Sequence, residues 1–150
     1  MPTFAHNNSL TAVSATATII IPDVAPAGHI FSGEFLDNAY TTGDLVNKEL
    51  KQTLQGVLKA GYIPQIKEVT ITLLPGTPSH NLFIDWYQAE ENVRGALECE
   101  SLVITLPAIK SIVTYTNGFL ATSKAMPDVK KILQEVSYKI SFGKVVITQM

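Results

Sequence analysis

The side chains of this sequence that could do chemistry are few, and their spacing does not fit a catalytic or metal site. The histidines, His6, His29 and His80, lie far apart, and none belongs to a ligand pattern such as HExxH. Ser79, His80 and Asp85 supply the residue types of a nucleophile, a base and an acid. Their positions instead predict a helix cap, a surface imidazole and a solvated carboxylate, because no oxyanion donors are visible. We therefore expect no enzyme activity, no cofactor and no bound metal.

One cysteine and one group of acids are the remaining candidates. Cys99 stands among apolar residues of an expected strand, where nothing nearby would lower the pKa of its thiol, so we expect it to be buried and unreactive. A single cysteine also excludes a disulfide framework and a cysteine-based zinc site. The acids allow three interpretations: a solvated face, a calcium site or the lining of a channel. They are Glu90, Glu91, Glu98 and Glu100.

The composition indicates one domain, over residues 1–150, with few surface charges. Charged residues make up 16% of the chain, below the usual quarter or so, and we expect other subunits to cover part of the surface. The net charge of −2 and the scattered basic residues argue against a nucleic-acid binder. The N-terminus lacks a signal-peptide pattern and the apolar runs are too short for a membrane helix, so we expect a soluble protein made in the cytoplasm.

Much of the chain shows the alternation that is typical of β-strands. Val13–Ile21 alternates up to Pro22, and a returning strand is expected at His29–Phe35 after a turn. Asn117–Gly118 between two apolar stretches predicts a tight hairpin. A change of apolar parity at Gly143 predicts a bulge in the last strand. The other expected strands are Glu68–Leu73, Leu97–Leu106, Ile109–Thr116, Phe119–Ser123 and Ser137–Thr148.

One helix is expected after Pro78, with Ser79 as its N-cap. Apolar residues follow at helical spacing and predict a stripe packed on a sheet face, with Trp86 as the main anchor. A second, short helical turn is expected at Asp128–Leu133. Asp44–Leu58 fits a helix or a strand, because its apolar residues satisfy both periods.

The order of several motifs resembles the tail tube proteins of contractile-tailed bacteriophages. The stretch Gly61–Leu73 (GYIPQIKEVTITL) is similar to that family's GYxPxxKExTITL run. The turn Thr77–Ser79 and the helical Asp85–Tyr87 (DWY) follow in the family's order. The resemblance covers about Gly61 to Phe142 and rests on order and spacing more than on one motif. It continues through Leu106–Pro107, Thr114–Gly118 (TYTNG), Met126–Lys131 (MPDVKK) and Tyr138–Phe142 (YKISF).

This resemblance implies a β-sandwich or flattened barrel flanked by one helix, so the expected fold is mainly β with one α-helix. Six copies would form a ring whose inner sheets join into a continuous β-barrel, and stacked rings would form a tube through which DNA passes. Closing a ring would also remove the open sheet edges of each subunit. By the same resemblance, Thr41–Tyr62 would be a long hairpin that turns near Gln55–Gly56 and projects onto a neighbouring subunit or ring.

The implied partners are further copies of the chain together with tail sheath, tape measure, baseplate and terminator proteins. DNA would pass without specific binding, no membrane would take part, and the protein would lie in the virion tail after assembly in the host cytoplasm. Because carboxylates on a channel wall would repel phosphate, we expect Glu98 or Glu100 to face the lumen. The expected inter-subunit contacts are Leu45, Leu50, Leu54, Leu58 and Tyr62.

Two other interpretations stay open. The first is the inner tube of a contractile injection system or of a type VI secretion system, which sequence alone hardly separates from a phage tube. The second is a monomeric β-sandwich that binds a ligand such as a carbohydrate. Such modules usually expose several aromatic residues on one face, whereas Phe83, Trp86 and Tyr87 are expected to lie in the core.

Overall fold

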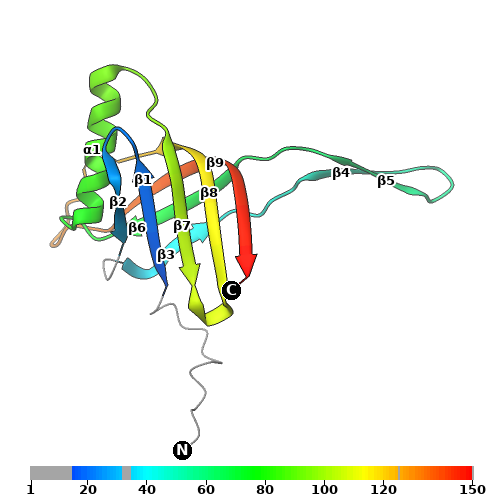
Figure 1. Ribbon diagram of the computed structural model, residues 1–150, viewed down its shortest axis with the longest axis horizontal. Coiled ribbons are helices and arrows are strands. Elements are labelled where there is room, and N and C mark those ends of the chain that lie inside the picture. Colours follow the sequence, from blue (N-terminus) through cyan, green and yellow to red (C-terminus); the bar gives the residue numbers. More distant parts are fainter. Residues whose placement is uncertain (1–14, 32–34, 125, 150) are drawn as a thin grey trace, which may run out of the picture.

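The computed structural model describes residues 15–31, 35–124 and 126–149, and it consists of antiparallel strands with one long helix (Figure 1). Seven strands form one sheet in the order β2-β1-β7-β8-β9-β6-β3, and β4 pairs only with β5. The expected fold class, mainly β with one helix, is confirmed. The elements are β1 (Thr16–Ile21), β2 (Ala25–Phe31), β3 (Phe35–Thr42), β4 (Lys48–Gln52), β5 (Leu58–Tyr62), β6 (Lys67–Leu73), α1 (Pro78–Val93), β7 (Cys99–Leu106), the 3₁₀ turn Pro107–Ile109, β8 (Ser111–Thr122) and β9 (Val136–Gln149).

The core lies on the inner side of a bent sheet. In Figure 1, β6 and β3 pass behind β1 and β7, and α1 stands beside β2. Phe83 of α1 stacks on Tyr138 of β9, with 4.5 Å between ring centroids, and on Phe31 of β2 at 6.1 Å. These contacts join strands that are not neighbours in the sheet, so the helix packs into the space between them.

The start of α1 differs from the prediction. The N-cap is Thr77, whose Oγ1 accepts a hydrogen bond from the His80 backbone N–H at 3.3 Å. Pro78 follows at the first helical position, where a missing N–H costs nothing. Ser79, the expected cap, lies inside the first turn and is fully buried, with its Oγ 2.9 Å from His29 Nε2. The cap therefore lies two residues earlier than the sequence suggested.

The apolar stripe of α1 lies against the sheet. Leu82, Phe83 and Trp86 are all buried. Trp86 has no exposed surface and donates a hydrogen bond from Nε1 to the Leu97 carbonyl at 3.0 Å. The helix ends at Val93. Its C-cap, Arg94, has a left-handed φ of 55° and donates its backbone N–H to the Glu90 carbonyl. Trp86 thus connects the helix to the loop that leads into β7.

The first two strands meet through a shorter turn than expected. Val24 donates a backbone hydrogen bond to the Ile21 carbonyl at 3.0 Å, and Ala25 already pairs with Ile21. The return strand is therefore Ala25–Phe31, not His29–Phe35. Pro26 is tolerated because β2 is an edge strand, where one side of the backbone needs no ladder bonds. Val13 and Ser14 of the expected first strand lie outside the described residues.

The hairpin expected at Asn117–Gly118 is wrong. β8 continues through both residues, and β9 pairs with it on both sides at one register, from Ser111↔Gln149 to Leu120↔Ile140. Asn117 has a left-handed φ of 59°, which the asparagine side chain tolerates, but it serves as an irregularity inside a strand rather than as a turn.

The parity switch expected at Gly143 is present, but its cause is different. In the register of β8 and β9, Asn117 stands opposite Gly143. Tyr115 comes before this point along β8 and Phe142 comes before it along β9, yet both are buried and their rings are 5.0 Å apart. No residue is inserted here, so this is not a bulge; the register of this pair shifts only between Leu120 and Thr122. A Cβ on Gly143 would lie 2.7 Å from Asn117 Nδ2, so glycine makes room for the asparagine.

The segment between β8 and β9 is not helical in its described part. The expected turn at Asp128–Leu133 is wrong, because these residues form bends with an isolated bridge between Val129 and Leu133. The Lys124 Nζ pairs with Asp128 Oδ1 at 2.8 Å, and the Gln134 N–H binds the Asp128 carbonyl. With this local pairing, the apolar side chains Val129, Ile132 and Leu133 stay exposed.

Candidate assembly surfaces

The segment that fitted both a helix and a strand forms the β4–β5 hairpin, which extends far from the sheet (Figure 1). Its turn is closed by Thr53 and Val57, with Thr53 N to Val57 O at 2.8 Å and Val57 N to Thr53 Oγ1 at 3.1 Å. Gly56 supplies the positive φ of 86° that the turn requires. β4 and β5 pair only with each other, and the hairpin projects without packing against the sheet.

The two faces of the hairpin differ in chemistry. Leu50 pairs with Ala60, Gln52 with Leu58 and Lys48 with Tyr62. Both leucines and Tyr62 therefore share one face, with Gln52 and Lys48 as its polar members. The other face carries Glu49, Lys51 and Lys59, with Lys51 Nζ 3.7 Å from a Glu49 oxygen. The hairpin is therefore amphipathic, like a strand pair with one buried face.

All residues of the hairpin are exposed, including those of the apolar face. Leu50, Leu58 and Tyr62 keep 59%, 62% and 70% of their surface accessible. Among the other expected contact residues, Leu54 stands at the exposed turn, and Leu45 lies near Tyr62 at the base of the hairpin. Within the described part of the chain, nothing packs over this face.

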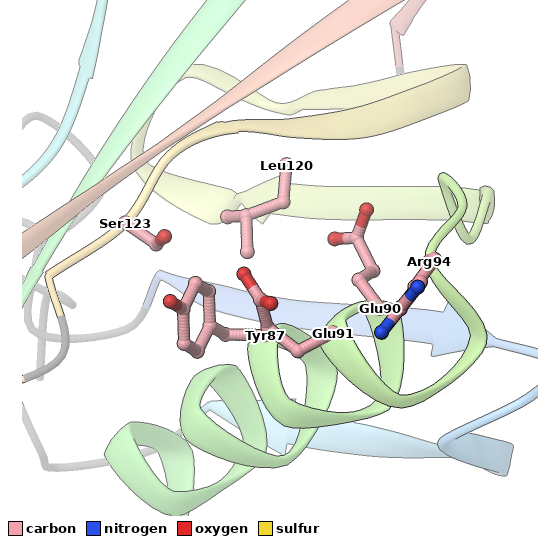
Figure 2. Close-up of a pocket in the computed structure, with 6 residues that line it drawn as sticks. All are labelled: Tyr87, Glu90, Glu91, Arg94, Leu120 and Ser123. Atoms are coloured by element: carbon pink, nitrogen blue, oxygen red, sulfur yellow. The ribbon is translucent and has the colours of Figure 1, made fainter.

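A second surface is the acidic pocket near the C-terminal end of α1 (Figure 2). This pocket of about 490 Å³ is lined by α1 and by the end of β8. Figure 2 shows the carboxylates of Glu90 and Glu91 on the side of the helix that faces Leu120. Burial raises the pKa of Glu90, and the charge of Glu91 adds to the rise. The lining residues are Tyr87, Glu90, Glu91, Arg94, Leu120 and Ser123.

The sequence grouped Glu90, Glu91, Glu98 and Glu100, but the pocket includes only the first two. Glu98 and Glu100 are exposed and flank the buried Cys99. Leu120 and Ser123 enter the pocket because the sheet brings β8 against the helix, and no local sequence signal shows that. Tyr87 and Arg94 could have been found, since they share a helical face with the two acids.

The side chains first considered for chemistry, such as Cys99 and His80, are buried in the structure. Burial raises the pKa of the Cys99 thiol to about 12, so the thiolate is not formed at neutral pH. The surface imidazole expected at His80 is wrong, because this side chain is buried. The backbone N–H of Gly76 donates to His80 Nδ1 at 3.1 Å, and burial lowers the pKa of His80. Among the described residues no three His, Cys, Asp or Glu side chains are placed to hold a metal ion. None of the described helices is long and apolar enough to cross a membrane.

Comparison with known proteins links the sequence to phage tails and the fold to contractile particles. The family model described as tail fiber protein gp32 matches residues 8–146. No curated protein matches the chain by sequence. A chain in the structure of the sheath/tube terminator of PVC, an extracellular contractile injection system, is 12% identical over 96% of this chain and 99% of that chain, with a TM-score of 0.63.

Two further structures share the fold at similar identity. A chain of the tube-terminating cap of the anti-feeding prophage is 11% identical, covers 99% of this chain and 97% of that one, and has a TM-score of 0.59. A chain of the PVC sheath–tube complex is 10% identical, covers 95% and 93%, and has a TM-score of 0.59. At these identities the similarity concerns the fold alone.

Proposed function

Since the chain belongs to the phage tail family described as tail fiber protein gp32, we propose that it is a structural subunit of a phage tail, which forms rings that stack into the tail tube. The fold supports a place in the tube rather than in a fibre, because its structural relatives come from sheath–tube, terminator and cap assemblies. In this proposal the subunit has no enzymatic role, and it acts through its contacts with further copies.

The β4–β5 hairpin carries the proposal. A two-stranded hairpin alone is marginally stable in water, and this one exposes three large apolar side chains on one face. Full burial of one such side chain stabilises a contact by about 1.5–3 kcal/mol. A second copy that covers Leu50, Leu58 and Tyr62 would therefore gain several such contributions at once. The projection of the hairpin in Figure 1 supports a contact with a neighbouring ring.

A tail tube also implies the partners of the subunit and the passage of DNA. Sheath, tape measure, baseplate and terminator proteins would surround a tube of this kind, and DNA would pass through it in the virion. Glu98 and Glu100 are both exposed, which supports a role at the lumen wall, where carboxylates repel phosphate. Cryo-electron microscopy of an assembled tube would test this role, and both side chains on the outer surface would contradict it.

A second candidate position is the end of the tube. The similarity to a sheath/tube terminator and to a tube-terminating cap supports it, since these assemblies close a tube instead of extending it. A tube subunit and a terminator would form different assemblies. A tube subunit forms filaments of many rings, whereas a terminator forms single rings that bind to tube ends.

The test is negative-stain electron microscopy of the purified protein over a concentration series. We expect rings or hollow tubes from the native chain and from Gly61→Lys, but only small particles from Leu50→Lys. Both variants add one positive charge to the hairpin, and only Leu50→Lys places it on the apolar face. An added Cβ at Gly61 has open space, so this control does not strain the strand. Assembly of Leu50→Lys at native concentration would refute the role of the hairpin.

A further inference from the structure

The connection between β8 and β9 exposes a group of apolar side chains. Residues 126–133, which we call the β8–β9 loop, contain four large apolar residues that are each more than half exposed. Single exposed apolar residues are common on protein surfaces, but a cluster of them is typical of an interaction site. The loop lies at the α1 end of the molecule, opposite to the hairpin (Figure 1). The four residues are Met126 (65%), Val129 (67%), Ile132 (75%) and Leu133 (51%).

The β8–β9 loop is held in shape by its own backbone. Val129 and Leu133 form an isolated antiparallel bridge, and the Gln134 backbone N–H donates to the Asp128 carbonyl at 3.1 Å. Residues 130–132 lie between the bridged pair and therefore form the tip of the loop. A turn that already has its shape loses less conformational entropy when it binds than a flexible segment does.

The tip of this loop is basic as well as apolar. Lys130 and Lys131 are both exposed, and they are the only basic doublet of the sequence. Asp128, the acid within the loop, is already paired with Lys124 at 2.8 Å. Neither lysine of the tip belongs to an ion pair in the part of the chain that the structure describes. A matching partner must therefore offer carboxylates together with apolar surface.

The acidic pocket at the C-terminal end of α1 has this complementary lining (Figure 2). Tyr87 and Leu120 supply apolar surface, and Glu90 and Glu91 supply carboxylates. Arg94 also lines the pocket, yet neither glutamate belongs to an ion pair among the described residues. Burial and the charge of Glu91 raise the pKa of Glu90, so a cation beside this carboxylate would be stabilised. The volume of about 490 Å³ lies within the usual range of binding pockets.

We propose that the tip of the β8–β9 loop of one copy binds the acidic pocket of a second copy, with its two lysines against Glu90 and Glu91. Loop and pocket are different surfaces of the same chain, so each copy can give its loop to one neighbour and its pocket to another. Such a head-to-tail contact repeats through an assembly. The inference rests on the proposed self-assembly and adds to it an interface at the end of the molecule away from the hairpin.

Reversing the charges on each side separately tests this contact. One variant carries Lys130→Glu and Lys131→Glu, and the other carries Glu90→Lys and Glu91→Lys. Each variant brings like charges together, so we expect the concentration at which rings or tubes appear to rise about tenfold or more. The unassembled subunits should keep the native urea midpoint, because the two lysines are exposed and positive charge is favourable near the end of α1. Lys110→Glu, at an exposed position between β7 and β8, is the control and should assemble like the native chain.

A mixture of the two variants distinguishes contact between copies from contact within one chain. In the mixture, the acidic loop of one variant meets the basic pocket of the other, and the two unchanged surfaces also match. Alternating copies should therefore assemble in electron micrographs. A chain with all four substitutions has the native net charge and should assemble alone.

Three results would overturn the inference and leave the proposed function intact. The first is normal assembly of either variant alone. The second is assembly of the combined chain without assembly of the mixture, which would place the pairing inside one chain. The third is no rescue by mixture or combination from subunits with native urea midpoints. No ring or tube from the native chain under any condition, with or without a nucleating baseplate, would refute both the inference and the proposed function.

Discussion

Trp86 and Tyr62 are both large aromatic residues, and the structure places them in opposite environments. Trp86 of α1 has no accessible surface and donates a hydrogen bond to the Leu97 carbonyl, whereas Tyr62 of the hairpin is 70% exposed. The same contrast separates the leucines of the core from Leu50 and Leu58. Apolar residues in the sheet and helix stabilise the fold of one chain, whereas those of the hairpin are exposed and in our proposal form contacts between chains. The comparison predicts that substitutions in the two regions affect different measurements.

The largest difference is expected between Trp86→Ala and Tyr62→Ala. Removing Trp86 leaves a cavity and a Leu97 carbonyl without its bond, so the free energy of unfolding should fall by about 3–5 kcal/mol. Tyr62→Ala should stay within about 0.5 kcal/mol of the native chain. Urea unfolding of the unassembled subunit measures both. A similar loss from both variants would mean that the hairpin packs on its own subunit in solution.

Gly118 in the core and Gly61 on the hairpin allow the two regions to be compared by adding a methyl group. A Cβ at Gly118 would overlap the ring of Phe142, whereas one at Gly61 has open space. We expect Gly118→Ala to cost about 1–3 kcal/mol because the Phe142 ring must move within the core. Gly61→Ala should change the unfolding free energy by less than about 0.5 kcal/mol. Thermal unfolding followed by circular dichroism separates the two, and equal midpoints would contradict the tight packing at Gly118.

Two threonines allow a smaller and more local test. Thr77 caps α1, and its replacement by alanine should cost about 1 kcal/mol of global stability. Thr53 makes an equivalent bond at the hairpin turn, where its Oγ1 accepts from Val57 N. Thr53→Ala should leave the urea midpoint unchanged and increase only the hydrogen-exchange rate of hairpin amides. A drop in the midpoint of Thr53→Ala would show that the hairpin unfolds together with the sheet.

The smallest effect at neutral pH should come from His80. Burial lowers the pKa of this imidazole, so the unfolded chain binds a proton more readily than the folded one. Stability is therefore complete above the unfolded pKa of about 6.5 and is lost as the pH falls through the lower folded value. His80→Gln should flatten the fall of the urea midpoint as the pH is lowered below about 6.5. An unchanged slope would assign the dependence to other groups.

Local sequence patterns predicted the structure correctly where the spacing of apolar residues along the chain decides the conformation. The stripe Leu82, Phe83 and Trp86 predicted the buried face of α1, because helical spacing alone brings these side chains together. The alternation from Val69 to Leu73 likewise predicted a strand with one buried face. The burial of Cys99 followed from its apolar neighbours.

Local patterns were insufficient where pairing between distant segments decides the conformation. Asn117–Gly118 carries the chemistry of a tight turn, but β7 and β9 hold it inside a long strand. Val129, Ile132 and Leu133 have helical spacing, but no helix forms there and all three are exposed. At Asn117–Gly118 the local preference for a turn is outweighed by the ladder hydrogen bonds to β7 and β9.

By itself the sequence determined a mainly β chain with one helix, a tryptophan anchor and an unreactive cysteine, because side-chain period and composition depend only on neighbours along the chain. Only the tertiary structure decided that Asp44–Leu58 is a free hairpin, that its leucines share one face, and that β9 outruns β6 and leaves an edge open. These features depend on which strands pair and where each pairing stops. Hydrogen bonds between residues far apart in the chain set those limits, and no local pattern encodes them.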